Sequence, residues 1–178
     1  MEKFMTCFAA AVITALAFVT VGCKSIPTSD TIYAVSESIG KTAGFAIELS
    51  KTKQEVKDGI IQVLDILSAT VPGTNETFVT KWMPIAETEI QKLIDAEKVT
   101  AEEGKVIKHA IYVACEGIDL IFVRYPVAKQ YKDLVSAAVD GFVTRFKSVV
   151  KATFAVTPDF DMEAYTYLRM KSATYKDK

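Results

Sequence analysis

The chain has 178 residues, of which 50% are hydrophobic and 24% are charged, and its formal net charge is −1. This composition excludes an intrinsically disordered chain, which would be poor in apolar residues, and the near-neutral charge argues against nucleic-acid binding as a main role. The length suits one domain with a substantial core.

The sequence changes character abruptly at residue 23. A short polar lead that contains Lys3 precedes an apolar run from Phe8 to Val21, and the small residues Gly22 and Cys23 follow it before the chain turns polar. A charged start, an apolar middle and small residues at the end predict a secretory signal peptide. An uncleaved signal anchor stays open as an alternative, because the apolar run approaches the ~20 residues that span a bilayer.

The segment Val21-Gly22-Cys23 resembles the lipobox of bacterial lipoproteins, a class that includes phage-encoded envelope proteins. The resemblance covers the leader only, and Thr20 stands where the lipobox usually has leucine. It implies cleavage before Cys23 and acyl chains, such as palmitate, on that residue. More than one chain is needed for stable anchoring, because a single acyl chain gives only marginal membrane binding. Lys24 and Ser25 lack the aspartate of an inner-membrane retention signal, so the analogy implies the outer membrane, facing the periplasm.

We therefore divide the chain into a signal peptide (1–22), a lipid-anchored tether (23–28), a helical bundle (29–172) and a frayed tail (173–178). Removal of the leader from the 178 residues leaves 156. Cys7 lies in the leader and Cys23 would carry lipid, so Cys115 is the one remaining thiol and no disulfide is expected within the domain. Its position in an apolar helical pattern predicts a buried, inert thiol.

The remainder predicts an all-α fold, a bundle of about five or six helices. Ser29 or Asp30 should be the N-cap of the first helix, since both residue types are favoured there. Ser36, Gly40 and Gly44 stand four apart on it. Small residues at this spacing let a second helix approach closely, and we favour packing within the domain over self-association.

The second and third helices are marked by their termini. Thr52-Lys53-Gln54-Glu55 reads as a capping box at the start of the second, and Val71-Pro72-Gly73 ends it. Thr74 or Asn75 should cap the third helix, which Pro84 should kink or split.

Three more helices follow. The capping box Thr100-Ala101-Glu102-Glu103 begins the most apolar one, which should be central to the bundle and end near Tyr125-Pro126. A regular three-four rhythm predicts the next helix from Val127 to Phe154. Thr157-Pro158-Asp159 predicts the start of a last helix that continues to Lys171. Nothing in the pattern calls for a sheet.

The candidate site residues lie along the central helix: His109, Glu116, Asp119 and Arg124. His109 is the only histidine, which excludes a multi-histidine metal site, and we expect neither metal nor cofactor. His109 and Glu116 are seven apart and so lie near one face, where a buried histidine–carboxylate pair could act as a general base. We favour a structural role, with Asp119 reaching Arg124 or a neighbouring helix, and predict no catalytic residue.

The end of the chain is rich in tyrosine and apolar residues, namely Tyr165, Tyr167, Leu168, Met170 and Tyr175. Tyrosines combine an apolar body with a polar tip, so this side could contact a partner. We favour the simpler interpretation that the last helix caps the bundle with it.

Three functional hypotheses remain. The leading one is a membrane-anchored, periplasm-facing, non-enzymatic component of the bacterial envelope that binds a protein or has a structural role, with self-association possible. The second is a carrier of a small ligand or lipid, with an apolar cavity beside Gly40, Gly44, Gly117 or Gly141. The third is an enzyme that uses the Glu116 region.

Overall fold

The computed structural model describes residues 26–47, 52–151 and 161–176. These residues form six α-helices and one short 3-10 helix, and the described ranges contain no strand: α2 (Ser29–Ala46), α3 (Gln54–Ser68), α4 (Phe78–Asp95), α5 (Ala101–Arg124), η2 (Pro126–Gln130), α6 (Lys132–Lys151) and α7 (Met162–Lys176). The predicted all-α bundle is confirmed.

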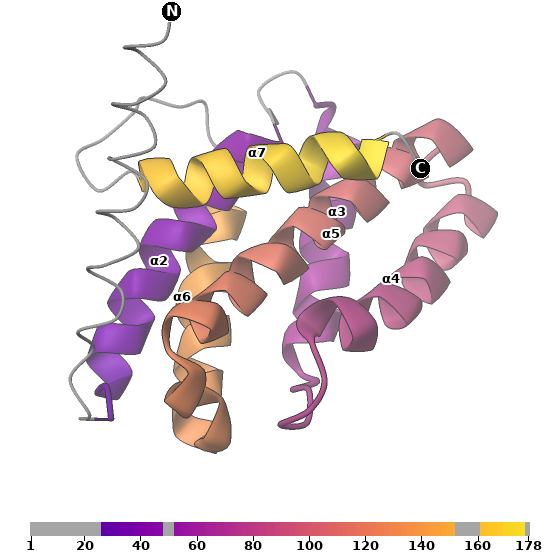
Figure 1. The fold of residues 1–178 in the computed structure, drawn as a ribbon. Coiled ribbons are helices and arrows are strands. Elements are labelled where there is room, and N and C mark those ends of the chain that lie inside the picture. Colours follow the sequence, from indigo (N-terminus) through magenta and orange to yellow (C-terminus); the bar gives the residue numbers. More distant parts are fainter. Residues whose placement is uncertain (1–25, 48–51, 152–160, 177–178) are drawn as a thin grey trace, which may run out of the picture.

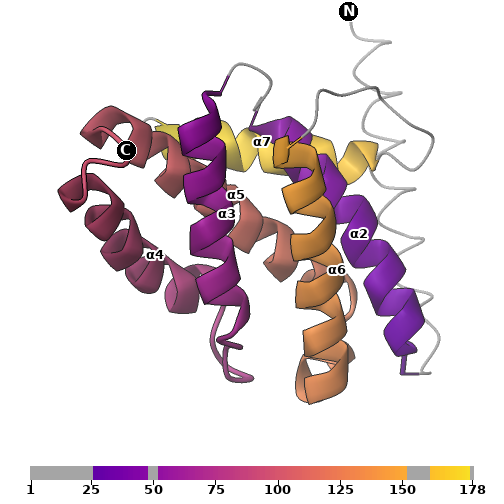
Figure 2. The ribbon, with the colours of Figure 1, turned by 180° about the vertical axis from the view of Figure 1, so that it is seen from behind.

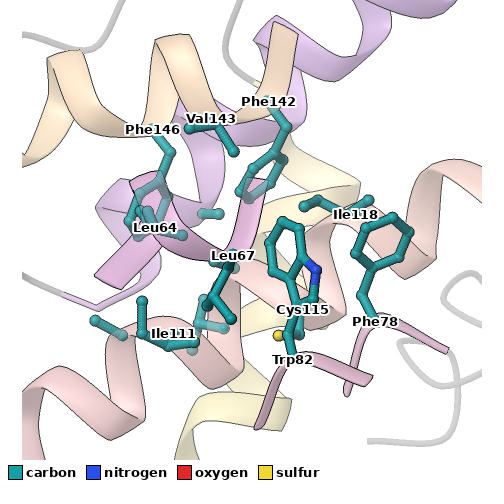
Figure 3. Close-up of a cluster of buried hydrophobic side chains, with 14 of the residues drawn as sticks. Leu64, Leu67, Phe78, Trp82, Ile111, Cys115, Ile118, Phe142, Val143 and Phe146 are labelled. Carbon is teal, nitrogen blue, oxygen red and sulfur yellow. The ribbon is translucent and has the colours of Figure 1, made fainter. Parts of the chain in front are cut away.

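Helix α5 is the centre of the bundle, as predicted. It contacts α2, α3, α4, α6 and α7, and seven of its apolar side chains are completely buried: Ile107, Ile111, Val113, Ala114, Cys115, Ile118 and Ile121. Figure 3 shows Cys115 and Ile118 of this helix close to Trp82. The indole Nε1 of Trp82 donates a hydrogen bond to the Thr70 carbonyl over 2.7 Å, so the largest core side chain also satisfies its polar atom.

Helices α2 and α6 run side by side and in the same direction (Figures 1 and 2), and they form the most extensive helix pair. Their approach depends on glycine. A Cβ at Gly40 would lie 2.5 Å from the carbonyl oxygen of Phe142, and one at Gly141 would lie 2.7 Å from that of Tyr33. The small residues therefore serve packing within the domain, as the sequence predicted.

The starts of three helices differ from the predictions. The N-cap of α2 is Thr28, whose hydroxyl accepts from the Thr31 amide over 3.2 Å, rather than Ser29 or Asp30.

Helix α3 starts one residue later than the predicted capping box requires. Its N-cap is Lys53, which makes no side-chain capping bond, so the Thr52–Glu55 box does not form. The Lys53 ammonium instead lies 2.7 Å from a carboxylate oxygen of Glu103 on α5.

Helix α4 begins after Thr77, which forms a capping box with Thr80, rather than after Thr74 or Asn75. Pro84 lies inside this helix and does not split it. Proline has no amide hydrogen to donate to the carbonyl four residues earlier, so the helix continues with one hydrogen bond fewer. The Pro84 carbonyl still accepts, and the Thr88 hydroxyl donates to it over 3.1 Å.

The Thr100–Glu103 capping box is confirmed, and α5 ends at Arg124, next to Tyr125. The next α-helix starts at Lys132 rather than Val127, because residues 126–130 form the 3-10 turn η2. Pro126 disfavours the helical conformation in the residue before it, so the chain breaks there and restarts after one tight turn.

The last helix, α7, begins at Met162 and continues to Lys176. Residues 173–176 therefore belong to a helix and not to the predicted frayed tail. The physical reason is the Tyr175 ring, which stacks on the Tyr112 ring with the two centroids 4.2 Å apart. Phe154 and the predicted cap Thr157-Pro158-Asp159 lie outside the described residues.

The predicted signal peptide and Cys23 also lie outside the described residues. Among the described residues, no helix is both long enough and apolar enough to cross a bilayer.

Candidate functional site: the seam between α5 and α7

Helix α7 lies across one end of the bundle, over α2 and α5 (Figure 1). Ala164, Leu168 and Ser172, spaced four apart, form its buried face, while Met170 is exposed. The tyrosines of this helix are half-buried. The last helix thus caps the bundle, as we favoured, and its contact with α5 is lined by polar groups that we call the α5–α7 seam: His109, Tyr112, Glu116, Tyr167, Lys171, Ser172 and Tyr175.

Glu116 is the anchor of this seam. Its carboxylate accepts hydrogen bonds from the Tyr112 hydroxyl (2.7 Å), the Tyr167 hydroxyl (3.0 Å) and the Lys171 ammonium (3.2 Å), although the residue is only 8% exposed. A buried charge is tolerated when a counter-charge and hydrogen bonds replace its water. Burial, reinforced by the adjacent carboxylate, raises the pKa of both phenols, so they stay protonated donors at physiological pH.

His109 lies at the other end of the seam. Its Nε2 and the Ser172 hydroxyl are 2.8 Å apart and share a hydrogen bond. The Tyr175 ring lies 5.4 Å from the imidazole and stacks on Tyr112.

His109 and Glu116 do lie on one face of α5, as predicted, with Tyr112 between them. Seven residues correspond to about 10 Å along a helix axis. Both oxygens of the Glu116 carboxylate accept hydrogen bonds from hydroxyl or ammonium groups. The alternative that we did not favour, a histidine–carboxylate general base, would need one of these oxygens to accept from the imidazole instead.

Asp119 reaches a neighbouring helix, one of the two predicted options. Its two carboxylate oxygens accept from the amides of Phe78 (3.0 Å) and Val79 (3.3 Å) at the start of α4. A carboxylate at this place satisfies orphan amides and complements the helix dipole. Burial raises the pKa of Asp119, and these two amides oppose the increase.

Arg124 joins α5 to the start of α7. Its guanidinium lies 2.7 Å from a carboxylate oxygen of Asp161 and 3.4 Å from one of Glu163. The Asp161 amide also donates to the Thr42 hydroxyl of α2 over 3.2 Å. Burial acts to raise the pKa of Asp161, but the Arg124 guanidinium and the Ala164 amide bring it below its usual value.

Several seam residues were missed by sequence reasoning. Tyr112 stands four residues before Glu116, a spacing that places both side chains on one helix face, so it could have been found. Lys171 and Ser172 could not, because their partners are far away in the sequence. The same is true of Arg169, which lies outside the seam and whose guanidinium donates to the Ala46 carbonyl of α2 over 2.8 Å.

The cavity predicted for a small-ligand carrier does not lie beside the four glycines. Phe142 backbone and ring atoms occupy the space beside Gly40 and Gly117, and Val149 fills the space beside Gly44. Gly141 is covered by the backbone of Tyr33.

Two open depressions of about 470 and 480 Å³ lie elsewhere, one between the starts of α3 and α5 and one on α4, and neither includes a seam residue. In the described part of the chain, no group of three or more histidine, cysteine, aspartate or glutamate side chains is placed to hold a metal ion. Comparisons with known protein-family models, with curated proteins and with solved structures found no match.

Proposed function

We propose that this chain is a lipid-anchored component of a bacterial envelope, held by acyl chains on Cys23 and facing the periplasm from the outer membrane. The observation that carries the proposal is the Val21-Gly22-Cys23 junction, at which a long apolar run ends in small residues and a cysteine. The first described helix begins at Ser29, so a short tether joins the anchor to the bundle.

In this proposal the protein acts by binding a protein partner or as a structural element, and not as an enzyme. The support is the use of the polar groups on α5. Glu116 and Arg124 hold α7, and Asp119 caps α4. Side chains engaged in this way stabilise helix packing, and a catalytic group would need access to substrate.

The anchor is tested in a bacterial host supplied with an alkyne-bearing palmitate. We expect the full chain to incorporate the label, to lose residues 1–22 and to remain with the membrane fraction. Cys23→Ser should abolish the label, whereas Cys115→Ser, which changes a buried thiol, should retain it. An intact leader on the membrane form, or an unmodified Cys23 by mass spectrometry, contradicts the proposal.

The binding role is tested by crosslinking in the same cells. A protein that crosslinks to the wild-type chain and not to membrane-free Cys23→Ser supports an envelope partner, and crosslinks between two copies would identify self-association. An anchored chain without any protein neighbour contradicts this part of the proposal.

A further inference from the structure

The chain enters the bundle at one identifiable end. In Figures 1 and 2 the start of α2, the turn η2 and the start of α6 lie at the same end of the molecule. Ile26 is the first described residue, and Cys23 precedes it by three. Consecutive Cα atoms are about 3.8 Å apart, so Cys23 lies within about 11 Å of Ile26 whatever the path between them. We call the start of α2, the end of α5, η2 and the start of α6 the tether end.

The tether end presents apolar side chains to solvent. Ile26, Val127 and Tyr131 are 50%, 45% and 41% exposed, and Val123, near the end of α5, is 69% exposed. Burial of Ala128 inside the turn η2 fixes which side of the turn faces the bundle, so Val127 is left outside. Of the large apolar side chains named as exposed in the described ranges, Val123 is the most exposed.

The polar residues at this end suit a membrane interface. Tyrosine is enriched at the level of lipid headgroups, and lysine can keep its charge in water while its stem covers apolar surface. Exposed Lys132 is accompanied by exposed Asp30 and Asp133, so charge of one sign does not dominate. The chemistry therefore favours the boundary between headgroups and acyl chains over a purely electrostatic contact with anionic lipid.

We propose that the tether end is the face with which the bundle rests on the bilayer, with Val123, Val127 and Tyr131 at the headgroup–acyl boundary. The inference rests on the proposed lipid anchor and adds to it the orientation of the domain. Because the anchor lies within about 11 Å, the bilayer is present at a high effective concentration next to the tether end of every anchored molecule. A protein partner that diffuses freely is not held near this end in the same way. The opposite end, which carries α7, then faces the periplasm.

The test compares two valines, Val106 near the start of α5 and Val127 in η2, just after the end of α5. Val127 and Val106 are of one residue type and are 45% and 43% exposed. Full-length chains with Val127→Cys or Val106→Cys are labelled with an environment-sensitive fluorophore; Cys115 is completely buried and does not compete. The lipidated proteins are reconstituted in vesicles of phosphatidylethanolamine and phosphatidylglycerol.

We expect the label at position 127 to shift its emission to the blue and to be quenched by lipids with a nitroxide near the headgroup. The label at position 106 should show neither change. Mass spectrometry of Cys23 and flotation with the vesicles are measured on the same samples, and circular dichroism verifies that both variants keep the helical fold. Tyr131→Cys gives a second position that should follow Val127→Cys.

Each other outcome overturns the proposal in a distinguishable way. If the labels at positions 127 and 106 behave alike on lipidated, vesicle-bound protein, the proposed membrane face is wrong and the proposed anchor still holds. Shielding at position 127 without vesicles, together with a doubled molar mass, assigns the face to a second copy of the chain. Protein that lacks lipid at Cys23 and stays in solution refutes the anchor and the face together.

Discussion

Among single residues, Glu116 carries the most consequential contacts. It lies on the most buried helix, and its carboxylate accepts from two phenols and one ammonium, two of which come from α7. Removal of one partner from a buried charged hydrogen bond leaves the other unsatisfied, which costs more than the bond itself contributes. The residue is therefore expected to secure α7 on α5.

We predict that Glu116→Gln lowers the free energy of unfolding by about 1–3 kcal/mol at pH 7. Glutamine keeps the shape but loses the charge that pairs with Lys171, and its amide nitrogen would face donor groups. The matched control is Glu102→Gln on the same helix, whose side chain is 81% exposed in its pair with Lys105; a surface pair of this kind should contribute less than about 1 kcal/mol.

Urea unfolding of both variants measures the difference. The cellular role should survive Glu116→Gln. A variant that keeps its stability but loses that role would show that Glu116 acts chemically, and the non-enzymatic proposal would then be wrong.

Among the helices, the pair α2 and α6 shows how a glycine at the contact allows two helix backbones to approach closely. The Gly40 site faces backbone atoms of Phe142, which cannot rotate away, whereas the Gly59 site on α3 faces the Cδ1 atom at the end of the Ile107 side chain. The same substitution should therefore have opposite consequences at the two positions.

We predict that Gly40→Ala destabilises the protein by about 1–3 kcal/mol, because the new Cβ would lie 2.5 Å from the Phe142 carbonyl and would force the helices apart. Gly59→Ala should be neutral or gain up to about 1 kcal/mol, since alanine is the better helix former and Ile107 can adjust. Chemical denaturation of both variants checks the pair. Equal stability of Gly40→Ala and wild type would contradict the close approach of α2 and α6.

The sequence predicted the helices better than their starts. Periodicity depends on many residues, whereas a start depends on a few and can be moved by tertiary contacts. At the start of α4 the amides of Phe78 and Val79 bond to Asp119, 41 and 40 positions away. That contact favours a helix that begins after Thr77 over one capped by Thr74 or Asn75.

Only the α5 side of the candidate site could be predicted from the sequence. Polar residues within an apolar helix identified His109, Glu116, Asp119 and Arg124, but their partners on α4 and α7 follow from no local pattern. The extension of α7 to Lys176 has the same origin. The segment around Tyr175 is rich in lysine and reads as a tail until Tyr112 supplies a ring to stack on.

The whole molecule is organised around α5, and Cys115 lies in the middle of it. The thiol is completely buried, and burial raises its pKa well above the usual value. A buried, protonated thiol reacts slowly with electrophiles. Modification of Cys115 therefore requires the bundle to open, and its rate reports the stability of the whole fold.

We predict that Ile118→Ala, at a completely buried position, costs about 2–5 kcal/mol and accelerates maleimide modification of Cys115. Each 1.4 kcal/mol corresponds to a factor of about 10 in the population of the open state, so the rate should rise by about 30-fold or more. Ile111→Ala should behave alike, and exposed Val106→Ala should leave the rate unchanged. Peptide mass spectrometry assigns the modified cysteine. Rates that do not respond to either isoleucine variant would place α5 outside the cooperative core.

The pairing of α2 with α6 has a consequence for how the chain folds. Their contacting residues are separated by roughly 100 positions, and the entropy of closing so long a loop must be met before the contact gains anything. Fold topologies rich in such distant contacts fold more slowly than bundles of sequence neighbours. A nascent chain emerges with its N-terminal end first, so the face of α2 that packs on α6 (Lys132–Lys151) stays uncovered until most of the 178 residues have been made. This first helix is the segment that a chaperone would need to hold.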